Sequence, residues 1–179
     1  WPRPAPRRRH RQHGAGIKVY PMYKRLLVPL DGSALAEAAL SHAEQLAAAG
    51  DGEIVLLRVV ISPYSIVAPD LVLAGQGIDQ DILQQQAEHY LQTAAARLAG
   101  RGFAVRTATC PGPVAEAILD HARSSDADLI VMSTHGRGGI SRWVYGSVAD
   151  RVLQAAPCPV LLIRAGAARA ENALGVVAE

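Results

Sequence analysis

The sequence has few aromatic residues, few cysteines and no long apolar run. Aromatic side chains make up 4% of the 179 residues, whereas half of the chain is hydrophobic. An aliphatic core of this kind is common where helices cover a parallel sheet. No stretch reaches the roughly 18 consecutive apolar residues of a membrane-spanning helix, so we expect none. The length is enough for one well-buried core and suits a single domain better than two.

The two cysteines do not form a recognisable chemical motif. Cys110 and Cys158 each precede a proline, and neither has a second cysteine at the CxxC spacing of metal and redox sites. Two cysteines in a chain of this length also do not make a disulfide framework. We therefore expect both thiols to be reduced and buried at strand ends, which favours a cytoplasmic location.

Acidic residues are absent from the beginning of the chain. Residues 1–22 contain six basic residues and no acidic residue, and they are rich in proline. Because they show neither helical nor strand periodicity, we expect a disordered basic extension. Residues 23–179 hold 12 basic and 16 acidic residues, which does not suit a nucleic-acid surface, although the extension leaves that alternative open. We expect one domain over 23–166 and a flexible tail over 167–179.

Apolar runs alternate with stretches of helical periodicity along the rest of the chain. This order predicts an α/β domain in which helices cover both faces of a parallel, doubly wound sheet. Ligands bind such sheets at the carboxyl ends of strands, where the winding direction reverses. Two strand ends carry polar and glycine residues, "VPLDGS" and "VMSTHGRGG". The five predicted strands cover residues 23–30, 52–60, 103–110, 127–133 and 158–165.

Residues 133–147, "STHGRGGISRWVYGS", form a glycine-rich stretch before a predicted helix. Backbone N–H groups of a glycine turn and of a helix N-terminus bind anions, and Arg137 and Arg142 add positive charge. This indicates a phosphate cradle. The alternative is a flexible connection in which Ser147 and Asp150 form a capping box. There is no G-K-[S/T] P-loop, and no G-x-G-x-x-G opens the first strand–helix turn.

One combination of residues resembles a known family. Ser133-x-x-Gly136, nine residues and then Gly146-Ser147 is similar to the nucleotide signature of the universal stress protein family, G-x-x-G, nine residues, G-[S/T]. The segments "YKRLLVPLDGS", "PGPVAEAI" and "APCPVLLIR" also fit, so the resemblance covers residues 23–165. Ser133 departs from the signature, because the family has glycine there and a serine Cβ would approach the ribose.

The resemblance implies a fold, a ligand and an assembly. The fold is a five-stranded parallel sheet of strand order 3-2-1-4-5, Rossmann-like and similar to the adenine nucleotide alpha hydrolases. The ligand is ATP, which Mg²⁺ can accompany, although we identify no dedicated metal site. The assembly is a homodimer joined through strand 158–165.

The resemblance also implies roles for individual residues. Asp31 contacts the ribose or adenine, with Pro29 beside it, and Val59 and Met132 line the adenine pocket. Glycine and serine backbone at the cradle holds the phosphates. The complete set of expected nucleotide-binding residues is Pro29, Asp31, Val59, Met132, Ser133, Gly136, Arg137, Gly146, Ser147 and Val148.

The expected function is regulatory nucleotide binding in a stress response. The sequence shows no clear catalytic base, no P-loop lysine and no arginine-finger pattern, so we assign no catalytic residue. A slow ATPase of the same fold is the alternative. We interpret His135 as a solvated loop residue. Trp143 and Tyr145 are expected to anchor the glycine-rich stretch to the body or to a partner subunit, with stacking on adenine as an alternative.

Overall fold

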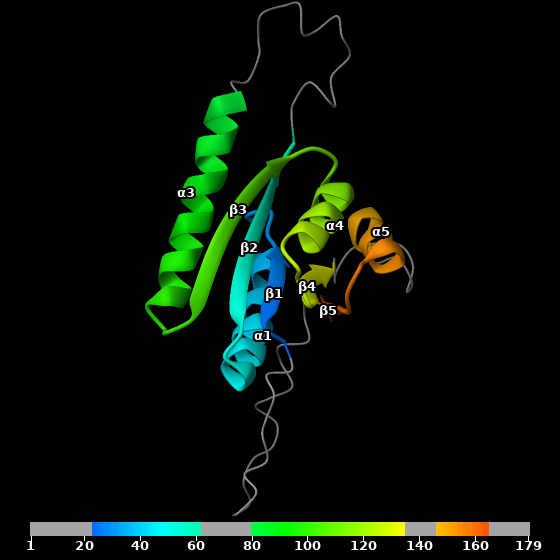
Figure 1. The fold of residues 1–179 in the computed structure, drawn as a ribbon. Coiled ribbons are helices and arrows are strands. Elements are labelled where there is room, and N and C mark those ends of the chain that lie inside the picture. Colours follow the sequence, from blue (N-terminus) through cyan, green and yellow to red (C-terminus); the bar gives the residue numbers. More distant parts are fainter. Residues whose placement is uncertain (1–22, 62–79, 135–145, 165–179) are drawn as a thin grey trace, which may run out of the picture.

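The structure, a computed structural model, describes residues 23–61, 80–134 and 146–164. Five parallel strands form one sheet of order β3-β2-β1-β4-β5 (Figure 1). This confirms the predicted α/β class and strand order. The elements are β1 (Arg25–Pro29), α1 (Ala34–Gly50), β2 (Glu53–Val60), α3 (Gln80–Ala99), β3 (Ala104–Pro111), α4 (Val114–Ser124), β4 (Leu129–Thr134), α5 (Ser147–Ala155) and β5 (Val160–Arg164).

The central strand β1 is almost wholly buried. Leu26, Leu27 and Val28 have no exposed surface, because β1 has a strand on each side and helices over both faces. In the parallel register, Leu27 lies opposite Val55 of β2 and Ile130 of β4. The continuous apolar runs of the sequence are therefore the interior strands of a parallel sheet, as such runs indicate.

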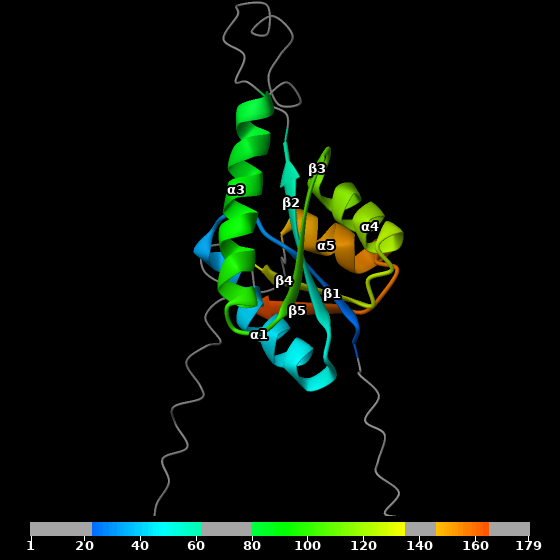
Figure 2. The same ribbon diagram turned by 60° about the vertical axis from the view of Figure 1, so that its left-hand side comes forward.

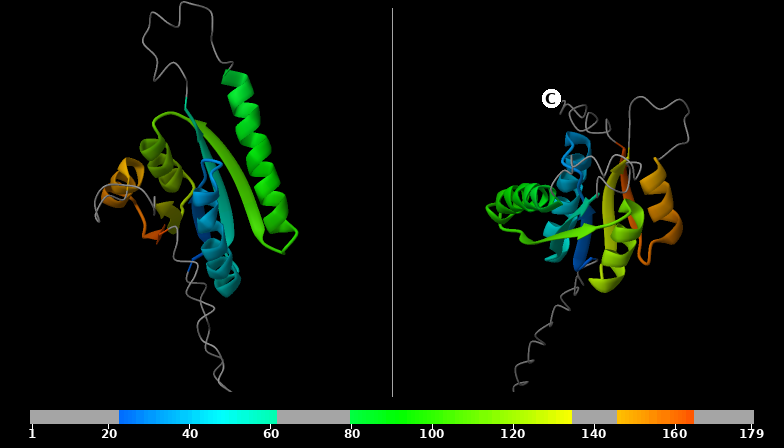
Figure 3. Two further views of the ribbon diagram at one scale, coloured as in Figure 1. Left: turned by 180° about the vertical axis from the view of Figure 1, so that it is seen from behind. Right: turned by 90° about the horizontal axis from the view of Figure 1, so that it is seen from above.

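Helices cover the two faces of the sheet separately. Successive side chains of a strand point to opposite faces, so Leu26 and Val28 pack with α1 and α3, whereas Leu27 packs with α4 and α5. Figure 2 shows α3 beside β2 and β3, and Figure 3 shows the two helical layers from above. None of the described helices combines the length and apolar character needed to cross a bilayer.

The chain reverses its winding direction between β1 and β4. From β1 it proceeds outward through β2 to β3, and it then returns to the other side of β1 to form β4 and β5. The connections on either side of this point leave the sheet in opposite directions, which opens a crevice at the carboxyl ends of β1 and β4.

Both cysteines are unpaired, but neither is fully buried. This corrects the expectation of buried thiols. Cys110 lies in the edge strand β3 and Cys158 lies just before the edge strand β5, and edge strands are covered less completely than central ones. Partial burial raises the pKa of each thiol, which favours the unreactive protonated form.

Candidate functional site

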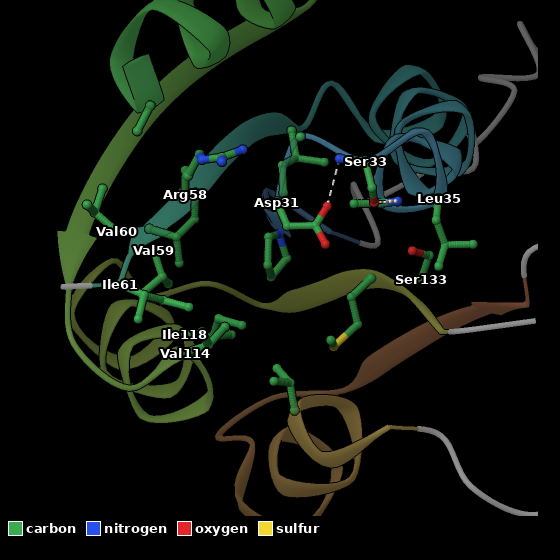
Figure 4. Close-up of a pocket in the computed structure, with 18 of the residues that line it drawn as sticks. Asp31, Ser33, Leu35, Arg58, Val59, Val60, Ile61, Val114, Ile118 and Ser133 are labelled. Atoms are coloured by element: carbon green, nitrogen blue, oxygen red, sulfur yellow. Dashed lines mark hydrogen bonds between the residues drawn. The ribbon is translucent and has the colours of Figure 1, made fainter. Parts of the chain in front are cut away.

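A pocket of about 880 Å³ lies at the carboxyl ends of β1, β2 and β4. Its walls come from these strand ends, from the first turns of α1, α4 and α5, and from one side of α3 (Figure 4). This is the switch point at which doubly wound sheets bind their ligands. The volume falls within the range of roughly 300–1,000 Å³ that is usual for small-molecule sites.

The turn after β1 places a carboxylate in the pocket. Leu30 continues the strand pairing through a hydrogen bond from its amide to the Leu57 carbonyl, 2.8 Å long. The chain then turns at Gly32, which has a φ of +85°. The Ser33 amide donates a 2.8 Å hydrogen bond to Oδ1 of Asp31, and Ser33 Oγ accepts one from the Ala36 amide at the start of α1. The Asp31 carboxylate is therefore held at a fixed position on the pocket wall.

Asp31 is a carboxylate at neutral pH. Partial burial by itself would raise its pKa, but hydrogen bonds from Ser33 and the positive charge of Arg58 outweigh that effect. The pKa consequently lies below the usual aspartate value. A carboxylate in this state accepts hydrogen bonds and does not donate them.

The first turn of α5 contributes unpaired donors to the opposite wall. Gly146 is the N-cap residue, with φ 87° and ψ 145°, and it provides no side-chain cap. The first intrahelical hydrogen bond runs from the Asp150 amide to the Gly146 carbonyl, 2.9 Å long. The amides of Ser147, Val148 and Ala149 thus lack helical acceptors, and they concentrate partial positive charge at the pocket.

The helix start also decides between two interpretations of the glycine-rich stretch. A capping box needs serine at the N-cap, with its side chain accepting from the backbone. Here the N-cap is Gly146, and Ser147 is the first helical residue. The capping-box alternative is therefore wrong for this helix, and the backbone donors remain available.

Between these polar walls the pocket is apolar. Met132 at the end of β4 and Ile118 of α4 are buried, and Val59 of β2, Val114 of α4 and Val148 of α5 are partly buried beside them. Figure 4 shows Val59, Val114 and Ile118 along one side of the pocket. An apolar wall beside a carboxylate and a cluster of amide donors suits a flat heterocycle that carries hydroxyl and phosphate groups.

The structure brings the described members of the expected set together in this one pocket. Eight residues line it, from β1, β2, β4 and the first turn of α5. Gly136 and Arg137 lie outside the described residues, as do His135, Trp143 and Tyr145. The eight lining residues are Pro29, Asp31, Val59, Met132, Ser133, Gly146, Ser147 and Val148.

Sequence reasoning missed the contribution of α3 and of Arg58. Arg58 in β2 and Leu83, Gln86 and Tyr90 in α3 also line the pocket. The guanidinium carbon of Arg58 lies 5.2 Å from the centre of the Tyr90 ring. A charged residue near the carboxyl end of a strand that is apolar from Ile54 to Leu57 was the available signal, because such a residue has to leave the core at the strand end.

Tyr90 is in turn fixed by charged neighbours. Its hydroxyl donates a 3.0 Å hydrogen bond to Oε1 of Glu37, and Arg97 pairs with Oε2 of Glu37 at 3.1 Å. Burial raises the pKa of Tyr90, and the hydrogen bond to Glu37 raises it further. The phenol therefore stays protonated and joins α3 to α1 beside the pocket.

The described residues offer no cluster of three or more His, Cys, Asp or Glu side chains that could hold a metal ion. The titratable groups on the described pocket wall are Asp31, Arg58 and Tyr90.

The model of the universal stress protein family matches residues 22–164 of this chain. A universal stress protein of Methanocaldococcus jannaschii is 32% identical over 146 residues, which cover 80% of this chain and 83% of the relative. One from Thermus aquaticus is 35% identical over 144 residues, which cover 80% of this chain and all of the relative.

Solved structures show the same fold. The UspA protein of Lactobacillus plantarum superposes with a TM-score of 0.65 at 28% identity, covering 79% of this chain and 98% of that one. A family member from Burkholderia pseudomallei reaches a TM-score of 0.60 at 35% identity, covering 80% and 98%. A universal stress protein of Archaeoglobus fulgidus, solved in complex with dAMP, has a TM-score of 0.58 at 24% identity, covering 79% and 98%.

Proposed function

This chain belongs to the universal stress protein family, and we propose that it binds ATP in the crevice between β1 and β4 as a regulatory nucleotide-binding protein of the stress response. The observation that carries the proposal is the pocket itself. A fixed carboxylate, an apolar wall and the unpaired amides of a helix start face one cavity of about 880 Å³.

The phosphate groups bind at the start of α5. Positive φ at Gly146 turns the backbone so that the amides of Ser147 and Val148 begin the helix at the pocket, and helix N-termini stabilise anions. A residue with a side chain at Gly146 would take up space where a phosphate approaches. We propose that Gly136 and Arg137 complete this cradle.

The ribose and the base bind toward β1 and β2. Asp31 accepts hydrogen bonds from hydroxyl or amino groups, because its pKa keeps it ionised. Pro29, Val59 and Met132 provide apolar contacts for adenine. A protein of the same fold is described in complex with dAMP, so this arrangement of elements can hold an adenine nucleotide.

Ser133 occupies the place of the first glycine in the family signature. It is partly buried at the end of β4 and lines the pocket. Its amide can donate as a glycine amide does, while its Cβ reduces the room for the ribose. We therefore propose that serine at this position changes the affinity for ATP and not the location of the site.

The groups on the described pocket wall favour binding over hydrolysis. A carboxylate with a lowered pKa is a weak base, a guanidinium does not release its proton at neutral pH, and Tyr90 holds its proton tightly. Slow ATP hydrolysis is the alternative outcome. We place the protein in the cytoplasm, because its unpaired cysteines suit a reducing compartment.

We also propose a homodimer joined through residues 158–165. β5 lies at the edge of the sheet and pairs with β4 on one side. Val160 and Leu162 are partly exposed there, and apolar strand edges tend to pair with another chain. Antiparallel pairing of two β5 strands would cover these side chains.

Calorimetric titration of the full chain with ATP, AMP and GTP tests the ATP proposal. We expect ATP to bind in a 1:1 ratio to each chain, tighter than GTP. A parallel assay of phosphate release should show none above the protein-free background. Phosphate release that saturates with ATP would favour the ATPase alternative, and no heat with either adenine nucleotide would contradict the proposed site.

A further inference from the structure

The pocket contains a cationic group that the phosphate cradle does not use. Arg58 is the single lysine or arginine among the described residues that line the pocket. Its guanidinium makes no hydrogen bond and no ion pair with the described residues; the contact it does make is with the Tyr90 ring. A guanidinium has five N–H donors, and donors left unpaired beside a pocket are available to a ligand.

The Arg58 side chain is held in place without using those donors. Tyr90 supports one side of the guanidinium and is itself anchored by Glu37. A Cβ atom on Gly32 would lie 2.6 Å from Nη1 of Arg58, so the absence of a side chain at Gly32 lets the guanidinium lie against the turn. A group fixed in this way loses little conformational entropy when it binds an anion.

The nearby acids are largely engaged elsewhere. Glu37 pairs with Arg97 and accepts from Tyr90. Asp31 accepts from the Ser33 amide at the start of α1. The positive charge of Arg58 lowers the pKa of Asp31, but Arg58 forms no ion pair with a carboxylate of the described residues, so its N–H donors remain available for a further anion.

Arg58 and Ser133, which lies near the end of β4, are on opposite sides of Asp31. Figure 4 shows Arg58 between α3 and Asp31, while Ser133 lies on the other side of Asp31. If the 5′-phosphates bind at α5 and the ribose binds beside Asp31, the group at Arg58 is carried by the 2′- or 3′-hydroxyl edge of the ribose. In dinucleotide-binding folds, either an acidic residue hydrogen-bonds the ribose 2′-hydroxyl or a nearby arginine accommodates a 2′-phosphate. This pocket has both kinds of residue, and the charge of Arg58 offsets the repulsion that the Asp31 carboxylate alone would exert on such a phosphate.

We propose that the pocket prefers adenine nucleotides that carry a phosphate on the ribose 2′- or 3′-oxygen, and that Arg58 binds this phosphate. The inference rests on the proposed nucleotide site and names the class of its ligand. The planar fork of arginine matches two phosphate oxygens, which a lysine at this position would not do.

The test compares AMP, ADP, adenosine 2′,5′-bisphosphate and adenosine 3′,5′-bisphosphate by calorimetric titration of the full chain. At least one of the two bisphosphates should bind about ten- to a hundredfold tighter than AMP, as expected for a hydrogen bond between charged groups. ADP controls for a second phosphate at the 5′ end. Arg58→Met should abolish the preference of the bisphosphate over AMP, measured as the ratio of the two affinities in the same variant.

Two further variants separate a specific contact from general effects. Arg123→Met removes an exposed positive charge of α4 that neither lines the pocket nor contacts Arg58, Tyr90 or Glu37, so it should keep the preference. Arg58→Lys keeps the positive charge but loses the planar fork, so it should retain only part of the preference for the bisphosphate. If Arg58→Met does not fold, the ratio of bisphosphate to AMP affinity in Arg58→Lys, compared with that in the wild type, tests the proposal.

The possible failures can be told apart. Wild-type protein that binds AMP but neither bisphosphate more tightly overturns this inference alone. A preference that survives Arg58→Met also overturns it. Wild-type protein that binds none of these nucleotides, nor ATP, overturns the proposed function as well.

Discussion

Oδ1 of Asp31 accepts a 2.8 Å hydrogen bond from the backbone amide of Ser33. The same turn starts α1 through the Ser33 side chain, so the helix start and the carboxylate are positioned together. Figure 4 shows this bond at the wall of the pocket. This turn is far from α5 along the sequence. A substitution of Asp31 therefore also tests whether the ends of β1 and β4 contact the same ligand.

Asp31→Ala should weaken ATP binding by about ten- to a hundredfold, since it removes a hydrogen bond from a charged acceptor. The free energy of unfolding should change by no more than about 1 kcal/mol, because Asp31 is exposed and Ser33 still caps α1. Titration calorimetry and thermal unfolding measure the two effects. Asp120→Ala is the matched control, since Asp120 lies on the exposed side of α4. If Asp31→Ala binds ATP as tightly as the wild type does, Asp31 does not contact the ligand.

Gly146→Val should abolish measurable ATP binding and lower stability by about 1–3 kcal/mol. With φ 87° and ψ 145°, the backbone at this position is close to a region that only glycine adopts without strain. The valine side chain also stands where a phosphate approaches. Gly102→Ala is the control for strain, because Gly102 has a φ of +91° and open space around it. This control should lose stability and still bind ATP; loss of binding in both variants would point to general destabilisation.

The pH dependence of stability should reveal the Asp31 carboxylate. Its folded-state pKa lies below the reference value of 3.8, so the charged form stabilises the folded state. That contribution is complete above about pH 5, and it is lost as the pH falls past the reference value and through the folded-state pKa. In Asp31→Asn, the free energy of unfolding should therefore decrease less below pH 4 than it does in the wild type. Its dependence on pH between pH 5 and 8 should be unchanged. Denaturant unfolding across this pH range measures the free energy of unfolding of both proteins. The same loss of stability at acidic pH in both proteins would contradict the lowered pKa.

Val160→Lys should prevent formation of the homodimer that we propose and leave a monomer. The substitution puts a charge on the edge strand through which we propose that two chains pair. Light scattering at micromolar concentration measures the molecular mass. Leu153→Lys is the control, because Leu153 is an exposed apolar residue of α5 outside the strand. Wild-type protein that is already monomeric would rule out the pairing.

Much of the architecture could be predicted from local sequence patterns. The aliphatic runs that became β1, β2 and β4 had to be buried on both faces, and the helical periods between them required parallel crossovers. The strand order was predicted only from the family resemblance, because the sequence of an apolar strand does not specify which strands lie beside it in the sheet. The resemblance also placed residues as distant as Asp31 and Gly146 at one crevice, and the structure shows both of them on its wall.

Tertiary structure alone decided two features of the pocket. The start of α5 was ambiguous in the sequence, because Ser147 and Asp150 fit a capping box. The structure excludes the capping box, because Gly146 is the N-cap residue and Ser147 is already the first residue of the helix. In the sequence, Arg58 is recognisable only as a charged residue near the end of a buried strand. Its role depends on which side of the sheet it leaves and on which helix covers that side, and Tyr90 reaches it from α3. Local propensity determines which segments are strands and helices, whereas the partners of a side chain at a strand end are set by how distant elements pack.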